Sequence, residues 1–248
     1  MGHGRLSPTE SHADGPTGAN VTEPNPTLPA SALWRDVHKG IRFGLTLAIS
    51  STSSLDPDDE ENRTGLAEMV QELVDLLDSH ADVEDRVTGP VIDDVLPDLG
   101  AQIRAAHEFL GPRAAALRVS ADRLLTAADP HAAIRSLHLD LAAFAGEYFI
   151  HQDHEERVVL PALEAAVGLE RVRELEIEFV AAVSPHDRML GLEFMVPAMN
   201  VVERAEVITA IRANAPAEVV AEVWELVTDV LDPEDVAALE ARLDRPRG

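Results

Sequence analysis

The spacing of apolar residues along most of the chain is that of amphipathic helices. Trp34, His38, Ile41 and Leu45 recur at intervals of three and four residues, which places them on one face of a helix. Three longer helical patterns follow, over about 65–94, 97–127 and 129–166. No stretch of useful length alternates with a period of two, so the pattern predicts an all-α protein without strands.

The chain divides into three parts. Residues 1–29 contain five prolines and four glycines without apolar periodicity, and such a segment cannot bury enough surface to order itself, so we predict a disordered tail. Residues 30–166 contain the four long helices. Residues 167–248 contain shorter amphipathic helices, with starts predicted at Asn200 and Asp232, and no motif of recognisable chemistry.

Charge and composition exclude several classes of function. The chain has 20 basic and 45 acidic side chains, a formal net charge of -25 and no cysteine. Nucleic acids and anionic membranes repel such a protein, and thiolate metal sites, disulfides and thiol nucleophiles are excluded. No apolar stretch approaches the ~20 residues of a membrane span, and no signal peptide is recognisable. We therefore expect a soluble, cytoplasmic protein.

Two segments, 80–93 and 151–164, share one 14-residue pattern. His, Asp, Glu, Arg, Val and Pro recur in them at identical offsets. An internal structural repeat explains this better than chance does. Each copy contains a His-x3-Glu pair, namely His80 with Glu84 and His151 with Glu155.

An earlier histidine accompanies each copy. His38 precedes His80 by 42 residues, and His107 precedes His151 by 44. The chain thus contains two helical hairpins, which together predict a four-helix bundle with approximate two-fold symmetry. At about 100° per residue, the His and Glu of each pair share a stripe of about 60° with core positions, so six potential ligands point inward.

Six buried polar groups of this kind predict a dinuclear metal centre. Desolvating an unpaired carboxylate costs several kcal/mol, and a cation removes that cost. Two histidines for each metal and two bridging carboxylates leave charge for an oxo or hydroxo bridge and an open position for a small ligand. Imidazole and carboxylate ligands favour non-haem iron, two per chain, and manganese or zinc is compatible by ligand type. The alternative is a duplicated fold with six hydrogen-bonded core groups.

The segments VHKGIRFGL, HADVEDRVTGPVID, AAHEFLGPRAAAL and HQDHEERVVLPALE resemble the hemerythrin-like, HHE cation-binding family over roughly residues 30–166. The resemblance implies a four-helix bundle with a non-haem di-iron centre that binds dioxygen or responds to oxygen, iron or oxidants. Carried over by motif, the ligands that it implies are His38, His80, Glu84, His107, His151 and Glu155.

Many members of that family have a seventh protein ligand, which this sequence does not supply in the usual way. Ala81, which follows His80, has no side chain that could bind a metal, and Glu155 stands in place of the second histidine of a His-x3-His pair. Glu147, one turn before His151, is the residue we predict for this role. Its counterpart in the other repeat is Leu76, so the repeat does not support it, and water or an unassigned group is the alternative.

The other histidines of the bundle and extension are expected outside the ligand set. We expect His154 near the ligands or partly exposed, His131 in solvent, His138 at the surface or the bundle edge, and His186 at a helix start.

Three functions fit these residues. The first is binding or sensing of dioxygen, nitric oxide or iron. The second is a redox enzyme that consumes peroxide or nitric oxide, and the third is an interaction module that uses the metal as a staple and docks a protein partner through the C-terminal helices. The chain has no Gly-rich phosphate loop, second cofactor motif or nucleophile–base pair, which favours binding or sensing of a small diatomic ligand or peroxide.

Overall fold

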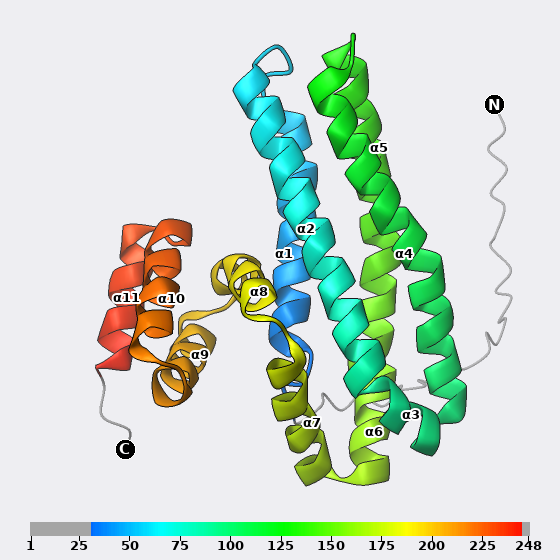
Figure 1. Ribbon diagram of the computed structural model, residues 1–248, viewed down its shortest axis with the longest axis vertical. Coiled ribbons are helices and arrows are strands. Elements are labelled where there is room, and N and C mark those ends of the chain that lie inside the picture. Colours follow the sequence, from blue (N-terminus) through cyan, green and yellow to red (C-terminus); the bar gives the residue numbers. More distant parts are fainter. Residues whose placement is uncertain (1–30, 245–248) are drawn as a thin grey trace, which may run out of the picture.

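The computed structural model describes residues 31–244, and the predicted disordered tail lies outside this range. The described residues form helices and no strand (Figure 1). The first part contains α1 (Arg35–Ser54), α2 (Glu60–Val87), α3 (Gly89–Val95), α4 (Pro97–Thr126), α5 (Pro130–His154), the π-helical turn η1 (Glu155–Val159) and α6 (Leu160–Val167). The second contains α7 (Leu169–Ala182), α8 (Pro185–Ala198), α9 (Val201–Asn214), α10 (Ala217–Val230) and α11 (Pro233–Leu243).

The four long helices α1, α2, α4 and α5 form an antiparallel bundle (Figure 1). Around the bundle, α1 packs on α2, α2 on α4, α4 on α5 and α5 on α1. Leu45, Leu73, Leu137 and Leu141 in its core are fully buried, and each such burial contributes roughly 1.5–3 kcal/mol. The prediction of an all-α four-helix bundle is confirmed.

Helix α2 begins earlier than the pattern predicts. The side chain of Asp59 accepts hydrogen bonds from the backbone N–H groups of Glu61 and Asn62. These bonds satisfy donors that have no partner within the helix. The helix therefore starts at Glu60 and not near Gly65.

The predicted helix over 65–94 is two helices in the structure, divided at Thr88. Pro90 lies just after the division, and a proline ring there would clash with the carbonyl of Arg86 in a continuous helix. The Thr88 hydroxyl donates a hydrogen bond to the carbonyl of Glu84 at 2.9 Å. The end of α2 at Val87 thus lies three residues after the predicted metal ligand Glu84.

The second repeat accommodates its proline in a different way. Pro161 corresponds to Pro90, but the chain stays helical from α5 to α6 through the π-helical turn η1. In that turn the N–H of Leu160 bonds to the carbonyl of Glu155, five residues back. Such π turns are frequent at functional sites, and this one begins at a predicted ligand.

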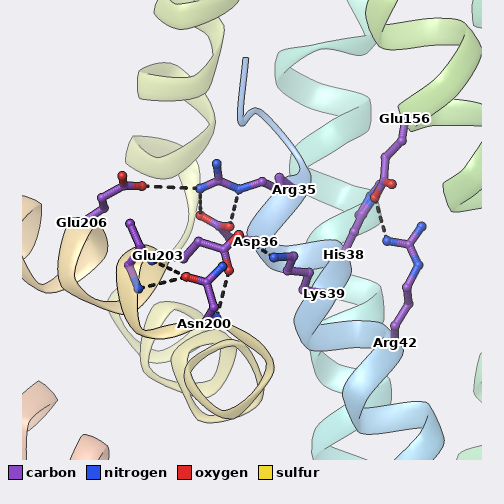
Figure 2. A network of polar contacts seen from close by, with 10 residues as sticks. Arg35, Asp36, His38, Lys39, Arg42, Glu156, Asn200, Glu203 and Glu206 are labelled. Atoms are coloured by element: carbon purple, nitrogen blue, oxygen red, sulfur yellow. Dashed lines mark hydrogen bonds and ion pairs between the residues drawn. The ribbon is translucent and has the colours of Figure 1, made fainter. Parts of the chain in front are cut away.

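The C-terminal helices cover one side of the bundle. Helix α7 packs on α2 and α6, and α8 packs on α1 and α2, whereas α9, α10 and α11 lie farther out (Figure 1). Residues of α8–α11 form their own apolar cluster, which includes Leu192, Ile208, Val227 and Leu239. In Figure 2, Lys39 of α1 pairs with Glu203 of α9, which ties the extension to the bundle.

Two glycines let α8 approach α1 closely. A Cβ atom at Gly40 would lie 2.9 Å from Cγ of Met195. At Gly44 it would lie 2.7 Å from Cδ1 of Leu73 and 2.8 Å from Cδ1 of Phe194. Any side chain at these positions would push α8 away from the bundle.

The helix starts predicted in the extension are present. The Asn200 side chain accepts from the N–H of Glu203, and the Glu203 carboxylate accepts from the N–H of Asn200. Helix α11 begins at Pro233, directly after Asp232. Within residues 31–244, no helix is both long enough and apolar enough to cross a lipid bilayer.

Candidate metal centre

Side chains from all four long helices meet in the bundle core, near the end where α1 begins and α2 ends. Histidines His38 and His80 come from α1 and α2, and their Nε2 atoms are 3.2 Å apart. His107 and His151 come from α4 and α5, with ring centroids 5.0 Å apart. The two histidine pairs therefore face each other from the two hairpins that the repeat predicts.

Two glutamates lie between the histidine pairs. An oxygen of Glu155 is 3.5 Å from Nε2 of His38, and its other oxygen is 3.0 Å from Nε2 of His151. One oxygen of Glu84 is 3.5 Å from Nε2 of His80 and 3.7 Å from Nε2 of His107. Each carboxylate thus reaches both pairs, as a bridging ligand must.

These polar atoms are buried without the partners that burial normally requires. Both oxygens of Glu84, both oxygens of Glu155 and Nε2 of His151 are inaccessible and lack a hydrogen-bond partner. An unsatisfied buried polar group costs about 1–3 kcal/mol, and a charged one costs more. Ligand atoms of His107, His151 and Glu155 lie within 4.8 Å of one another. The donor set and its orphaned atoms fit metal cations.

Burial also sets the protonation of this cluster. Desolvation lowers the pKa of His38, lowers that of His80 well below its ordinary value, and lowers that of His151 to about 3. The same effect raises the pKa of Glu84 to about 8 and that of Glu155 well above its ordinary value, with each glutamate next to a further carboxylate. His38, His80 and His151 are therefore neutral, with lone pairs available, and a cation must displace protons from the glutamates.

Two further carboxylates hold the outer nitrogens of the histidines. Nδ1 of His38 donates to Glu156 at 2.9 Å, and the same Glu156 oxygen accepts from Arg42 at 2.7 Å (Figure 2). Nδ1 of His107 donates to Asp85 at 2.8 Å. Each bond places the proton on Nδ1 and leaves Nε2 free to face the cluster, which orients the ligand and raises its basicity.

The sequence interpretation missed Asp85 and Glu156, although the repeat contained a signal for them. They directly follow Glu84 and Glu155, at the same offset in both copies. In the structure each of them holds the histidine of the other hairpin. An acidic residue at an equivalent place in both copies was a reason to assign them a role.

The structure brings together the six residues carried over by motif but leaves Glu147 at the surface. Its carboxylate pairs with Arg113 at 3.1 Å and is 40% exposed. A cavity of about 270 Å³ opens beside it between α4 and α5, and His151 lies at its inner side. The ligand role of Glu147 stays a prediction, and the contact that the structure gives it is with Arg113.

The remaining histidines lie where they serve other contacts. His138 bonds through Nδ1 to the hydroxyl of Thr52 at 2.7 Å, His131 is exposed near Asp58, and His186 is exposed in the first turn of α8. His154 lines the α4–α5 cavity together with His151.

A four-helix bundle with a central cluster of histidines and glutamates defines a cation-binding helical protein. The family model of the hemerythrin HHE cation-binding domain matches residues 30–163. The chain therefore belongs to the hemerythrin HHE cation-binding family, as its motifs predict. No curated protein and no solved structure matches the chain.

Proposed function

We propose that the protein holds two non-haem irons per chain and uses them to bind or sense dioxygen or a related redox-active diatomic. One observation carries this proposal: Glu84 and Glu155 are fully buried between two histidine pairs, and no group outside these two carboxyls hydrogen-bonds to their four oxygens. Two cations, one at each histidine pair, would satisfy all of these oxygens.

The residues of the chain would divide the work. His38 and His80 would hold one ion and His107 and His151 the other, while Glu84 and Glu155 would bridge them. Iron, when bound, supplies a reversible change of oxidation state and an open position for a small ligand. Asp85 and Glu156 keep Nε2 of two of the histidines directed inward.

The position of the C-terminal helices supports sensing. Helix α8 packs on α1 and α2, the helices that carry His38, His80 and Glu84. Gly40 and Gly44 of α1 lie close to Met195 and Phe194 of α8, so a small shift of α1 would displace α8.

Metal analysis of the protein purified from its own host tests the proposal. We expect two irons per chain and a charge-transfer band that responds reversibly to oxygen. Glu84→Ala combined with Glu155→Ala should abolish iron binding. The matched control is Asp82→Asn with Asp153→Asn, because these aspartates form surface pairs with arginines in the same repeats. Unchanged metal content in the glutamate variant would overturn the di-metal assignment.

An enzyme would behave differently in the same preparation. Sustained loss of peroxide with many turnovers per iron, abolished by Glu84→Ala, would replace sensing by catalysis as the function.

A further inference from the structure

The two histidine pairs differ in what covers them. His38 is fully buried and His80 is 4% exposed. The indole of Trp34 stacks on His38, with ring centroids 6.1 Å apart, and Phe179 of α7 lies 5.9 Å from His80. Trp34 and Phe179 belong to one apolar cluster that closes this end of the bundle.

An ion pair covers the same side. Arg42 pairs with Glu156 beside His38. In α1, Arg42 lies four residues after His38. The equivalent position after His107 is Gly111, where a Cβ atom would have no neighbour within 4 Å. The second pair therefore lacks the cationic cover of the first.

The α4–α5 cavity reaches the second pair at the ring of His151, which is 7% exposed, whereas His107 is not among its lining residues. Ala106, Phe109, Leu110 and Ile150 make most of its exposed lining apolar, and Gln102, Glu147, His151 and His154 complete it. Arg113 lies at its rim, 3.5 Å from the centre of the Phe109 ring and paired with Glu147. The helices of the extension pack on α1, α2 and α6, and they lie on the other side of the bundle from α4 and α5 (Figure 1).

We propose that uncharged diatomic ligands enter between α4 and α5 and reach the centre at the His107/His151 pair, and that Trp34, Phe179 and Arg42 close the His38/His80 pair. The mostly apolar lining favours a small neutral molecule over a charged one. This inference rests on the proposed function, because it assumes that the cluster is a ligand-binding centre.

Histidine accessibility in the metal-free protein gives the first test, and it needs no iron. Diethylpyrocarbonate modifies neutral imidazoles, and mass spectrometry of peptides separates the sites. We expect His151 to react at least about tenfold faster than His38, which corresponds to a barrier difference of about 1.4 kcal/mol. Exposed His131 serves as the internal reference. Equal rates at His38 and His151, or faster reaction at His38, would overturn the proposed route.

A single introduced cysteine gives the second test, because the chain contains none. Ile150→Cys on α5 places a thiol at the cavity, and Ile150 is 73% exposed. Leu139→Cys is the control on the same helix, 57% exposed and away from the cavity. Both variants are labelled with N-phenylmaleimide after folding, and the extent of labelling is checked by mass.

Labelling at position 150 should protect His151 from diethylpyrocarbonate, and labelling at 139 should not. In the ferrous protein, stopped-flow binding of nitric oxide should slow by about tenfold or more with the adduct at 150. If fully labelled, fully iron-loaded Ile150→Cys protein binds nitric oxide at an unchanged rate, the proposed entry route is wrong, but the proposed function still stands. Absence of iron from the unmodified protein overturns the proposed function, while the histidine accessibility still decides which end of the cluster is open.

Discussion

Nδ1 of His38 donates to the carboxylate of Glu156 at 2.9 Å, across the bundle from one hairpin to the other. Burial alone would raise the pKa of Glu156, but its hydrogen bonds from His38 and Arg42 lower that pKa to about 2. Glu156 is therefore ionised at neutral pH. An ionised acceptor on Nδ1 fixes the tautomer of His38 and presents the lone pair of Nε2 to the metal centre.

Glu156→Gln should weaken metal binding by about 10–100-fold, the usual cost of losing such a partner of a ligating histidine. The amide keeps the shape of the side chain but removes the charge that fixes His38. Competition with a chelator of known affinity measures the loss. Asp85→Asn should act in the same direction through His107, and Asp82→Asn, on the exposed face of α2, is the control that should leave affinity unchanged.

The stability of the metal-free protein should depend on pH through the buried glutamates. Glu84 has a pKa of about 8 when folded and Glu155 is also raised, so the folded state holds protons that the unfolded chain releases at ordinary carboxyl values. Stability from these groups is fully present below the ordinary carboxyl pKa and is lost as pH rises through about 8. Urea unfolding at several pH values should show this decline, and Glu84→Gln should flatten it.

The buried histidines act in the opposite direction at lower pH. The pKa of His151 is lowered to about 3, so its contribution to folding stability is present above the ordinary histidine value and is lost as pH falls toward 3.

Metal affinity should rise with pH across the interval in which Glu84 and Glu155 lose their protons, because the cation competes with those protons. A metal affinity that does not vary with pH would contradict the protonation described for Glu84 and Glu155 in the metal-free protein.

Removal of the metals should destabilise the bundle. A ligand at about 100 times its dissociation constant stabilises the folded state by about 2.7 kcal/mol, and for a chain of this size that corresponds to roughly 5–10 °C in melting temperature. Calorimetry before and after chelation measures the shift. The variant that combines Glu84→Ala with Glu155→Ala should show no response to chelator, whereas a response there would indicate metal bound elsewhere.

Gly44→Ala should loosen α8 from the bundle. The added methyl would overlap Leu73 and Phe194 at less than 3 Å, and overpacking of this kind typically costs about 1–3 kcal/mol. Gly146→Ala in α5 is the matched control, because a Cβ atom there meets nothing within 4 Å and alanine is the better helix former by up to about 1 kcal/mol. In chemical unfolding, the free energy of unfolding should therefore fall for Gly44→Ala and rise for Gly146→Ala.

The sequence alone determined the bundle and the six residues of its centre. Helical periodicity fixed which face of each helix is buried, and the repeated His-x3-Glu placed four of the six residues on those faces. Such local patterns are readable because successive turns of one helix bring residues four apart together. Helix ends were less well determined: the start of α2 depended on the Asp59 cap, and the break at Thr88 depended on how the chain accommodates Pro90.

Tertiary structure decided the relationships between helices. The pairing of Asp85 with His107, and of His38 with Glu156, joins residues from different hairpins, and no periodicity within one helix encodes such a contact. The same holds for the docking of α8 on Gly44 and for the opening beside His151. Local spacing indicates which side chains form the cluster. Which end of the cluster is open follows from how separate helices pack, and packing depends on the shapes of surfaces distant in the sequence.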